Sequence, residues 1–413
     1  ALFEHNIVFR NVMTECAREC ESLLPLPLLE VLFPDGDEYA GAIQRPAFAL
    51  PALFAVEYAM AKFVMDRGVK PSALLGHSLG EYVAVCLAGV LTLEDALHLV
   101  RFRGEIMQSC PPGSMLALRG NPKDVETLLE GGLEIAAINM PGQTVVSGTV
   151  EAITRLKELL AERDIVSQVL ETSHAFHSSL MESALPAFRE RLSALSLQAP
   201  RLDVISNRTG TWLTAEQATS VEYWVEHLRH TVRFAEGLET LSALSGAVFV
   251  EIGPGQALAR FAEAQLGAGC ATVNTLPGAI SQMSETETLA RATAELWLQG
   301  VRLAWRHVHG EQTTRRVPLP VYPFERTPHF VALKTSPTLP TVSVEDVKLP
   351  EMEDWFYVPT WRSQPAVKMS TDKSATTIVV LGHPDQRDRL TEALAADDVI
   401  WVKAGAKWAQ AET

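Results

Sequence analysis

The 413-residue sequence lacks the features of several large classes of protein. It has 35 lysine and arginine residues against 50 aspartate and glutamate residues, and its formal net charge of −15 repels the phosphate backbone of nucleic acids. It has no run of 18 apolar residues, and its first residues lack a basic segment followed by an apolar one. We therefore expect no nucleic-acid partner, no membrane span and no signal peptide.

Cysteine is also scarce, and its spacing excludes the common structural uses of the thiol. None of the five cysteines has a Cys-x-x-Cys partner. Cys16 and Cys20 are one helical turn apart, but no second pair of cysteines or histidines stands near them to complete a zinc site. We expect reduced thiols in a cytoplasmic protein, with no bound metal.

Apolar residues, in contrast, are plentiful and are arranged in readable patterns. They make up 47% of the chain, and the length predicts two or three domains. Apolar residues recur at helical spacing from 47 to 65, an apolar run follows at 71–75, and 81–88 is again helix-like. This order of helix, strand, turn and helix is typical of an α/β-hydrolase-like fold.

Shorter units follow Pro111-Pro112-Gly113. The pattern predicts strands at 114–119, 133–139, 144–148 and 166–170, with helices at 122–130 and 151–163. The resulting β-α-β-β-α-β order predicts a ferredoxin-like small subdomain inserted into the α/β body. Strands at 204–206 and 247–252 return the chain to the large subdomain.

These patterns divide the chain into four parts. We assign 1–112 and 178–300 to the large subdomain, 113–177 to the small subdomain and 301–353 to a proline-rich linker. Residues 354–413 are expected to begin a following domain, with a strand at 376–381 and a helix at 386–395. Gly382-His383-Pro384 is not a G-x-G-x-x-G loop, so we expect no bound cofactor there.

Residues 76–80, Gly-His-Ser-Leu-Gly, have the pattern of a nucleophile elbow. A strand that turns sharply into a helix exposes the central side chain, and glycines at both ends remove the Cβ atoms that would clash. Ser78 is therefore the candidate nucleophile. The five-residue pattern also occurs by chance, so its weight depends on the rest of the chain.

A serine needs a base within hydrogen-bond reach. The best candidate is His177, which follows the last strand of the small subdomain where the chain must return to the main body. His77 competes, but a side chain next to the nucleophile usually points away from it in a tight elbow. Taken alone, His174 and His177 would be interpreted as exposed loop histidines.

A second feature lies 25 residues after the serine, where Arg103 falls on the next predicted helix. The planar guanidinium fork holds a carboxylate bidentately and stays charged, which favours a substrate with a free carboxylate. Helical spacing alone favours a simpler interpretation, in which Arg101 or Arg103 pairs at the surface with Glu94, Asp95 or Glu105.

Three motifs, in this order and spacing, resemble the acyltransferase domain of modular polyketide synthases, the family of malonyl-CoA:acyl-carrier-protein transacylases. They are Gly76-His77-Ser78-Leu79-Gly80-Glu81, Arg103-Gly104-Glu105-Ile106-Met107-Gln108 and His174-Ala175-Phe176-His177-Ser178. Supporting stretches include Ser206-Asn207-Arg208-Thr209-Gly210 and, in the linker, Leu319-Pro320-Val321-Tyr322-Pro323-Phe324-Glu325-Arg326. The resemblance covers about residues 1–330.

The resemblance implies a role for each matched residue. Ser78 would be the nucleophile, His177 its base, the Leu79 backbone N–H an oxyanion donor, and Arg103 the clamp for a malonyl carboxylate. A backbone carbonyl, expected near 244–246, would orient the histidine. The implied substrates are malonyl-CoA and the phosphopantetheine thiol of an acyl carrier protein, and the linker would dock a ketosynthase domain.

The matched motifs also imply specificity for the acyl group. The pattern from His174 to His177, together with Leu79 at the elbow, accompanies malonyl units in the family, whereas Tyr-Ala-Ser-His accompanies methylmalonyl. The physical reason is bulk, because Phe176 would occupy the space that an α-methyl group needs. Excluding one methyl group by packing is worth roughly 1–3 kcal/mol.

The chain departs from the family at one point. Family members open with a Gly-Gln-Gly-x-Gln loop that supplies a second oxyanion donor, and this sequence contains no such loop. Loss of one such donor costs about 10²–10³ in rate, and loss of the strand before it could prevent folding. The region 355–361 resembles the entry to the structural half of a ketoreductase region.

Two alternatives remain at this point. A serine hydrolase or esterase with the same elbow would need an acid between the serine and the histidine, such as Asp95 or Asp164, and no carboxylate clamp. A truncated, non-catalytic segment that only docks neighbouring domains is the other.

Overall fold

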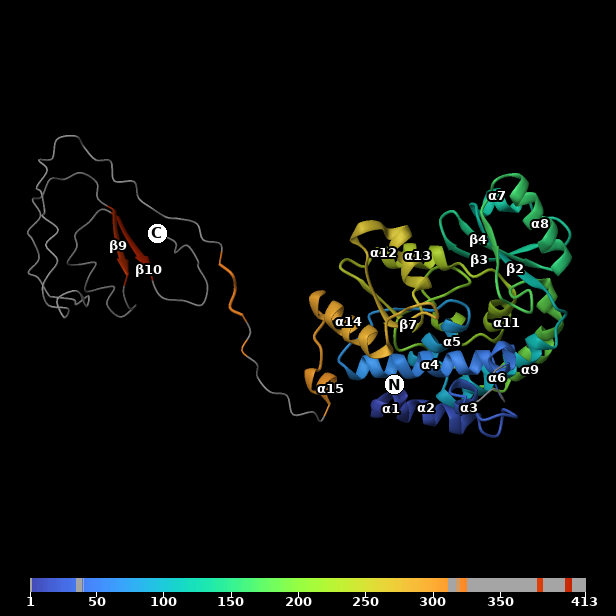
Figure 1. Cartoon of the computed structure of the whole chain (residues 1–413), viewed down its shortest axis with the longest axis horizontal. Coiled ribbons are helices and arrows are strands. Elements are labelled where there is room, and N and C mark those ends of the chain that lie inside the picture. Colours follow the sequence, from blue (N-terminus) through green and yellow to red (C-terminus); the bar gives the residue numbers. More distant parts are fainter. Residues whose placement is uncertain are drawn as a thin grey trace, which may run out of the picture. The chain divides into compact units, whose positions relative to one another are not determined.

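The computed structural model describes residues 2–34, 39, 41–310, 318, 320–324, 377–381 and 398–402. It divides the chain into two compact units, Ala1–Leu319 and Pro320–Thr413. Each unit is described by itself. The first unit contains the helices and strands from α1 to α15 that Figure 1 labels.

The first unit begins with helices that pack on one long apolar helix. The long helix is α4 (Pro46–Asp66). It is contacted by α2 (Ile7–Cys20), α3 (Leu28–Leu32) and the 3₁₀ turn η2 (Ala42–Gln44), and α1 (Leu2–His5) packs on α2. α4 begins with Pro46 at its first turn, where the missing N–H costs nothing. It packs between α2 and α6 (Leu93–Gln108), and it buries Phe48, Phe54, Met60 and Phe63.

By length and composition alone, α4 is the single described helix that could cross a membrane. More than half of its apolar window is buried inside the protein, and among its neighbours is β7 (Val248–Pro254). A helix that is apolar on all sides and is covered by protein is the central helix of a core, and this is its place in Figure 1.

The large subdomain is built on short parallel strands. β1 (Leu74–Leu75) pairs with β6 (Val204–Ile205), and β7 (Val248–Pro254) pairs with β8 (Ala271–Leu276). In the part of the chain that is described, no ladder joins the two pairs. The other helices and 3₁₀ turns of this subdomain are α5 (Leu79–Leu87), η3 (Ser179–Ala184), α9 (Leu185–Ser193), α10 (Ala215–Ala218), α11 (Val221–Arg229), α12 (Phe234–Ser242), α13 (Ala257–Leu266), η4 (Gly267–Gly269) and α14 (Glu285–Leu298). A short helix, α15 (Trp305–His309), follows in the region assigned to the linker.

The small subdomain has the predicted β-α-β-β-α-β order. Its elements are β2 (Ser114–Arg119), α7 (Pro122–Glu126), β3 (Glu134–Met140), β4 (Gln143–Gly148), α8 (Val150–Glu162) and β5 (Ser167–Val169). The strands form an antiparallel sheet of order β3-β4-β2-β5, which is the ferredoxin-like order. The expected α/β fold, with its inserted small subdomain, is confirmed.

The small sheet has a separate core on each face. Leu116 and Val146 pack with Leu156 and Leu160 of α8 on one face. On the other face, Met115, Ala137 and Val145 pack with Phe234 and Leu238 of α12. The sheet is therefore held between its own helices and those of the large subdomain, and the junction between the subdomains is a packed apolar surface.

Two predictions about element length are wrong, and one about the C-terminal part is confirmed. The strand expected at 71–75 is only two residues long, and the helix expected at 122–130 ends at Glu126, before the two glycines 131 and 132 take positive φ. In the second unit, β9 (Thr377–Leu381) matches the predicted strand and pairs in parallel with β10 (Asp398–Val402). The predicted helix 386–395 and most of the linker lie outside the described residues.

Candidate active site

The predicted elbow is formed between β1 and α5. Ser78 precedes α5 with φ 50° and ψ −103°, a region that a side-chain-bearing residue rarely adopts. The turn is so tight that a Cβ on Gly76 would lie 2.0 Å from the backbone of Gly80. Glycine at position 76 is therefore a steric requirement of the turn, and a strained backbone of this kind is typical of a functional serine.

His177 lies beside the serine. Its Nε2 is 2.8 Å from the Ser78 Oγ, and its Nδ1 is 2.9 Å from the backbone oxygen of His230. A carbonyl oxygen only accepts, so Nδ1 carries the proton and Nε2 presents its lone pair to the serine hydroxyl. The two side chains, 99 residues apart in sequence, form a serine–histidine pair with the donor and acceptor in the correct sense.

The carbonyl that orients His177 was predicted near 244–246, and this prediction is wrong. The oxygen belongs to His230, the residue that follows α11. The carbonyl oxygens at the C-terminal end of a helix accept no hydrogen bond from the helix itself. A helix end that faces the histidine therefore supplies a free acceptor. No residue type marks such a carbonyl in a sequence.

The surroundings of His177 keep its imidazole neutral. The side chain is buried, and burial is the largest cause that lowers its pKa well below the ordinary value of 6.5. The positive charge of Arg103 and the neighbouring imidazoles of His227 and His77 lower the pKa further. A neutral imidazole is the form that accepts a proton, so the site holds a base near pH 7.

His77, the competing base, is turned away from the serine. Its Nε2 lies 2.8 Å from the Asn139 Oδ1 on β3 of the small subdomain. Its ring also lies against Phe234, with 5.4 Å between the ring centroids. His77 thus links the elbow to the small subdomain and does not contact the Ser78 hydroxyl.

The two candidate arginines of α6 have different environments. Arg101 forms an ion pair with Glu105, as helical spacing allows. Arg103 is 1% exposed, its Nη2 donates to the Ser78 Oγ over 3.1 Å, and its guanidinium carbon lies 5.3 Å from the centre of the Tyr82 ring. Among the described residues no carboxylate forms an ion pair with Arg103, and its Nε has no hydrogen-bond partner.

The remaining predicted residues surround this pair. Leu79 is buried and is the first residue of α5, so its backbone N–H has no acceptor within the helix. The His174 and Phe176 rings stack with centroids 6.2 Å apart, and the Phe176 backbone oxygen accepts from Ser147 of β4 over 2.8 Å. The Phe176 side chain packs between the cores of both subdomains.

Four further polar side chains lie behind the elbow, and none of them was predicted as a site residue. Asn207, Glu81, Tyr223 and His227 are all buried there. Glu81 and Asn207 belong to motifs that were noted for the resemblance, but their contacts join residues 126 positions apart. Spacing along a sequence gives no signal for such a contact.

Neither of the two acids that a hydrolase triad could use, Asp95 and Asp164, is a hydrogen-bond partner of His177. Asp95 accepts from the Thr92 hydroxyl at the start of α6, and Asp164 follows α8 in the small subdomain with φ 56°. The Nδ1 of His177, where the acid would bind, is occupied by the His230 carbonyl.

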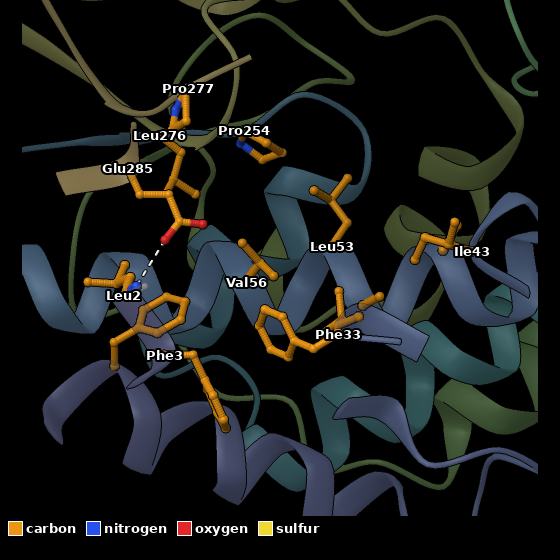
Figure 2. A pocket seen from close by; sticks show the side chains of 14 residues that line it. Leu2, Phe3, Phe33, Ile43, Leu53, Val56, Pro254, Leu276, Pro277 and Glu285 are labelled. Atoms are coloured by element: carbon orange, nitrogen blue, oxygen red, sulfur yellow. Dashed lines mark hydrogen bonds between the residues drawn. The ribbon is translucent and has the colours of Figure 1, made fainter. Parts of the chain in front are cut away.

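A cavity of about 460 Å³ is shown in Figure 2. Its walls are mainly apolar side chains of α1, α3 and α4 and residues at the ends of β7 and β8, among them Phe3, Phe33, Leu53 and Leu276. Glu285 accepts from the Leu2 backbone N–H over 2.9 Å at one edge. None of Ser78, His177 and Arg103 lines this cavity, so its volume is no part of the site described above.

A strained serine, a neutral histidine and a buried cation, at the junction of an α/β body and a ferredoxin-like insert, define a serine enzyme of acyl transfer. Comparison with known proteins identifies the family to which the chain belongs. The family described as "Acyl transferase domain" matches residues 1–302. The chain belongs to this family, and its relatives are polyketide synthases.

Two of these relatives are much longer than the chain. A phenolphthiocerol/phthiocerol polyketide synthase subunit from Mycobacterium tuberculosis is 35% identical over 338 residues, which are 80% of this chain and 22% of that protein. Spectinabilin polyketide synthase system protein NorB of Streptomyces orinoci is 37% identical over 326 residues, 77% of this chain and 15% of that protein. The chain therefore matches about a fifth or less of either relative.

Solved structures show the same fold. The acyl transferase domain of ZmaA superposes with a TM-score of 0.72 at 35% identity, over 77% of this chain and 75% of that one. The malonyl CoA-acyl carrier protein transacylase from Clostridium perfringens gives a TM-score of 0.64 at 26% identity, over 73% of this chain and 92% of that one. The chain is thus an acyltransferase of the polyketide synthase type.

Proposed function

We propose that this acyltransferase loads a malonyl unit from coenzyme A onto the phosphopantetheine thiol of an acyl carrier protein, through an ester on Ser78. The observation that carries the proposal is Arg103, a buried guanidinium 3.1 Å from the nucleophilic oxygen with no carboxylate partner among the described residues. A buried charge is costly unless it is paired. A carboxylate on the substrate supplies the missing partner.

The reaction has two halves that use the same groups. As the Ser78 Oγ attacks the thioester carbonyl, its proton passes to the His177 Nε2, and the Leu79 N–H and Arg103 lie beside the developing charge. The C–S bond breaks, and coenzyme A leaves as a thiol with that proton. The carrier thiol then gives its proton to His177 and attacks the ester, and Ser78 recovers the proton as it leaves.

Arg103 also explains why the substrate should carry a carboxylate at a fixed distance from the thioester. The guanidinium comes from α6 and the serine from the start of α5, so two packed helices set their separation. A carboxylate bound at Arg103 would hold the acyl carbonyl at the elbow, which converts binding energy into orientation.

The choice of malonyl over methylmalonyl rests on Phe176. The ring stands one residue before the base, stacks on His174 and is packed by both cores, so it has little freedom to make room for an α-methyl group. We extend the proposal to the parent assembly, with a ketosynthase domain docked through the linker and a cytoplasmic location for the whole synthase.

A competition experiment tests the substrate. The chain is incubated with equal malonyl-CoA and methylmalonyl-CoA, and the two acyl-enzymes are separated by intact mass. We expect malonyl to prevail, and Phe176→Ser to lower the malonyl preference by roughly 10-fold or more, since one methyl group is worth about 1–3 kcal/mol.

The matched control is Phe33→Ser, which removes an exposed phenylalanine of the cavity in Figure 2, lined by none of Ser78, His177 and Arg103, and should leave the ratio unchanged. A ratio that Phe176→Ser leaves unaltered, or a preference of the parent chain for methylmalonyl, contradicts the assignment of the extender unit.

A further inference from the structure

Asn207 lies behind the elbow and hydrogen-bonds to both of its arms. Its side-chain oxygen accepts the backbone N–H of Ser78 over 2.7 Å. Its side-chain nitrogen donates to the backbone oxygen of Gly76, also over 2.7 Å. One amide thus spans the three residues over which the chain reverses from β1 into α5.

These two bonds serve a backbone that is held in an unfavourable conformation. A non-glycine residue at φ 50° and ψ −103° costs on the order of 1–3 kcal/mol and persists only where its surroundings fix it. The Ser78 N–H precedes the helix and the Gly76 C=O follows the short strand, so neither is satisfied by regular structure. Asn207 satisfies both.

Asn207 is itself fixed on every side. It is 1% exposed, its backbone N–H donates to the Glu81 Oε2 over 2.7 Å, and its backbone oxygen accepts the Arg233 N–H over 2.8 Å. Glu81 is fully buried and also accepts from the Tyr223 hydroxyl. The amide is therefore a rigid reference point, not an adaptable surface group.

The same frame sets the position of the base. The C=O of His230 binds the Nδ1 of His177, and three residues later the N–H of Arg233 binds Asn207. Between them, Val232 is hydrogen-bonded in both directions to β3 of the small subdomain. Segment 230–233 thus contacts both the histidine, through the His230 carbonyl, and Asn207, which holds the serine backbone.

We propose that Asn207 is a positioning residue for acyl transfer: it holds the strained Ser78 backbone so that the Oγ stays aimed at His177 and the Leu79 N–H stays aimed at the oxyanion. It contacts none of the reacting atoms. An amide is required because the site needs one acceptor and one donor, whereas aspartate offers acceptors only and places a carboxylate beside the Gly76 carbonyl. The inference rests on Ser78 as the nucleophile, which is part of the proposed function.

The test compares Asn207→Asp and Asn207→Ala with the parent in the full chain. The first measurement is the rate at which a fluorophosphonate probe modifies Ser78, which needs no coenzyme A substrate. The second is kcat and KM for malonyl-CoA consumption, and the third is the thermal midpoint of unfolding. Asn121→Ala is the matched control, since Asn121 precedes α7 in the small subdomain and is exposed.

We expect both Asn207 variants, assayed below their midpoints, to lose roughly 10- to 100-fold in probe rate and in kcat, as small misplacements of reacting groups do, with little change in KM. Asn121→Ala should match the parent. Folded variants that keep the parent probe rate and kcat would overturn the proposal, because a purely structural residue lowers the midpoint and leaves the folded enzyme active.

If Asn207→Ala is unfolded at the assay temperature, Asn207→Ser takes its place. Its hydroxyl is too short to span both arms, so we expect the same loss, and parent rates in this variant would overturn the proposal. A parent chain that the probe labels at Ser78 but that malonyl-CoA does not acylate would contradict the proposed substrate and leave the positioning role standing.

Discussion

At the scale of single residues, the site is organised around a buried charge. Arg103 lies over the Tyr82 ring and beside the Ser78 Oγ, and burial lowers its pKa while the guanidinium remains charged near neutral pH. Two residues earlier on the same helix, Arg101 is neutralised by Glu105. Arg101 and Arg103 are the same residue type on different faces of α6, so a substitution of Arg101 is a control for a substitution of Arg103.

Arg103→Ala should lower kcat/KM for malonyl-CoA by on the order of 10²-fold or more, since it leaves a buried substrate carboxylate unpaired. The effect on acetyl-CoA, which has no free carboxylate, should be much smaller. Steady-state kinetics with both thioesters measure the difference, and Arg101→Ala should behave as the parent chain. An equal loss of kcat/KM for malonyl-CoA and acetyl-CoA would contradict the role of Arg103 as a carboxylate clamp.

The pH dependence of acylation follows from the environment of His177. Because burial and then Arg103 hold its pKa well below 6.5, the base stays deprotonated and kcat/KM should remain flat from pH 8 to below 6.5. Arg103→Ala removes the second cause, so the acid limb should move to higher pH. An acid limb at or above pH 6.5 in the parent chain would show that the imidazole is not shielded in this way.

The same shift has a consequence for stability. In the unfolded chain the imidazole takes up a proton near pH 6.5, whereas in the folded chain it resists protonation. The unfolded state therefore binds more protons below pH 6.5, and this group makes the folded protein less stable as the pH falls through that region.

The sequence predicts side chains at this scale better than backbone groups. Ser78, His177 and Arg103 are a hydroxyl, an imidazole and a guanidinium, whose chemistry indicates a nucleophile, a base and a carboxylate-binding group. The structure brings the three together. The backbone carbonyl of His230 cannot be recognised from its residue type, and the orienting carbonyl was predicted about fifteen residues further along the chain, near 244–246. Every residue has a carbonyl group, and only the packing of α11 decides which one reaches His177.

At the scale of elements, close packing of helices sets the geometry of the site. α6 crosses α4 where a Cβ on Gly104 would lie 2.4 Å from the Pro46 backbone oxygen. Glycine is thus needed for contact between the helices, although in an exposed helix it would be less stable than alanine. This crossing fixes the helix turn that carries Arg103.

Gly104→Ala should therefore destabilise the protein by about 1–3 kcal/mol, the usual effect of an extra methyl group in a packed core. Thermal unfolding followed by circular dichroism measures the change. Gly41→Ala is the control, because a Cβ there meets nothing within 4 Å, and its φ of −95° is open to alanine. Equal midpoints for the parent and Gly104→Ala would mean that the helices adjust without cost.

The elements themselves were predicted with uneven success for a physical reason. Most elements of the small subdomain show alternation or helical periodicity over five to thirteen residues, which is visible in the sequence, and only β5 is shorter. β1 and β6 are two residues long, so no period is established, and their ends depend on the ladder that they form with each other. The longer periodic elements were therefore recovered, whereas the strand at 71–75 and the helix at 122–130 were predicted too long.

At the scale of the whole molecule, the site belongs to the junction between the two subdomains. The elbow comes from the large subdomain, His77 reaches Asn139 of β3, and His177 follows the last strand of the small subdomain. Only the folded first unit brings these segments together. The chain spans 22% of the Mycobacterium tuberculosis polyketide synthase protein that it matches, so the partners of the transfer are proposals about a larger assembly.

The measurement that tests the account most directly is the covalent state of the whole chain after incubation with malonyl-CoA. Intact mass followed by peptide mass should show one malonyl group, located on the peptide that contains Ser78 and absent from Ser78→Ala. A folded chain that gains no malonyl group after prolonged incubation, or carries it on another residue, would contradict the account.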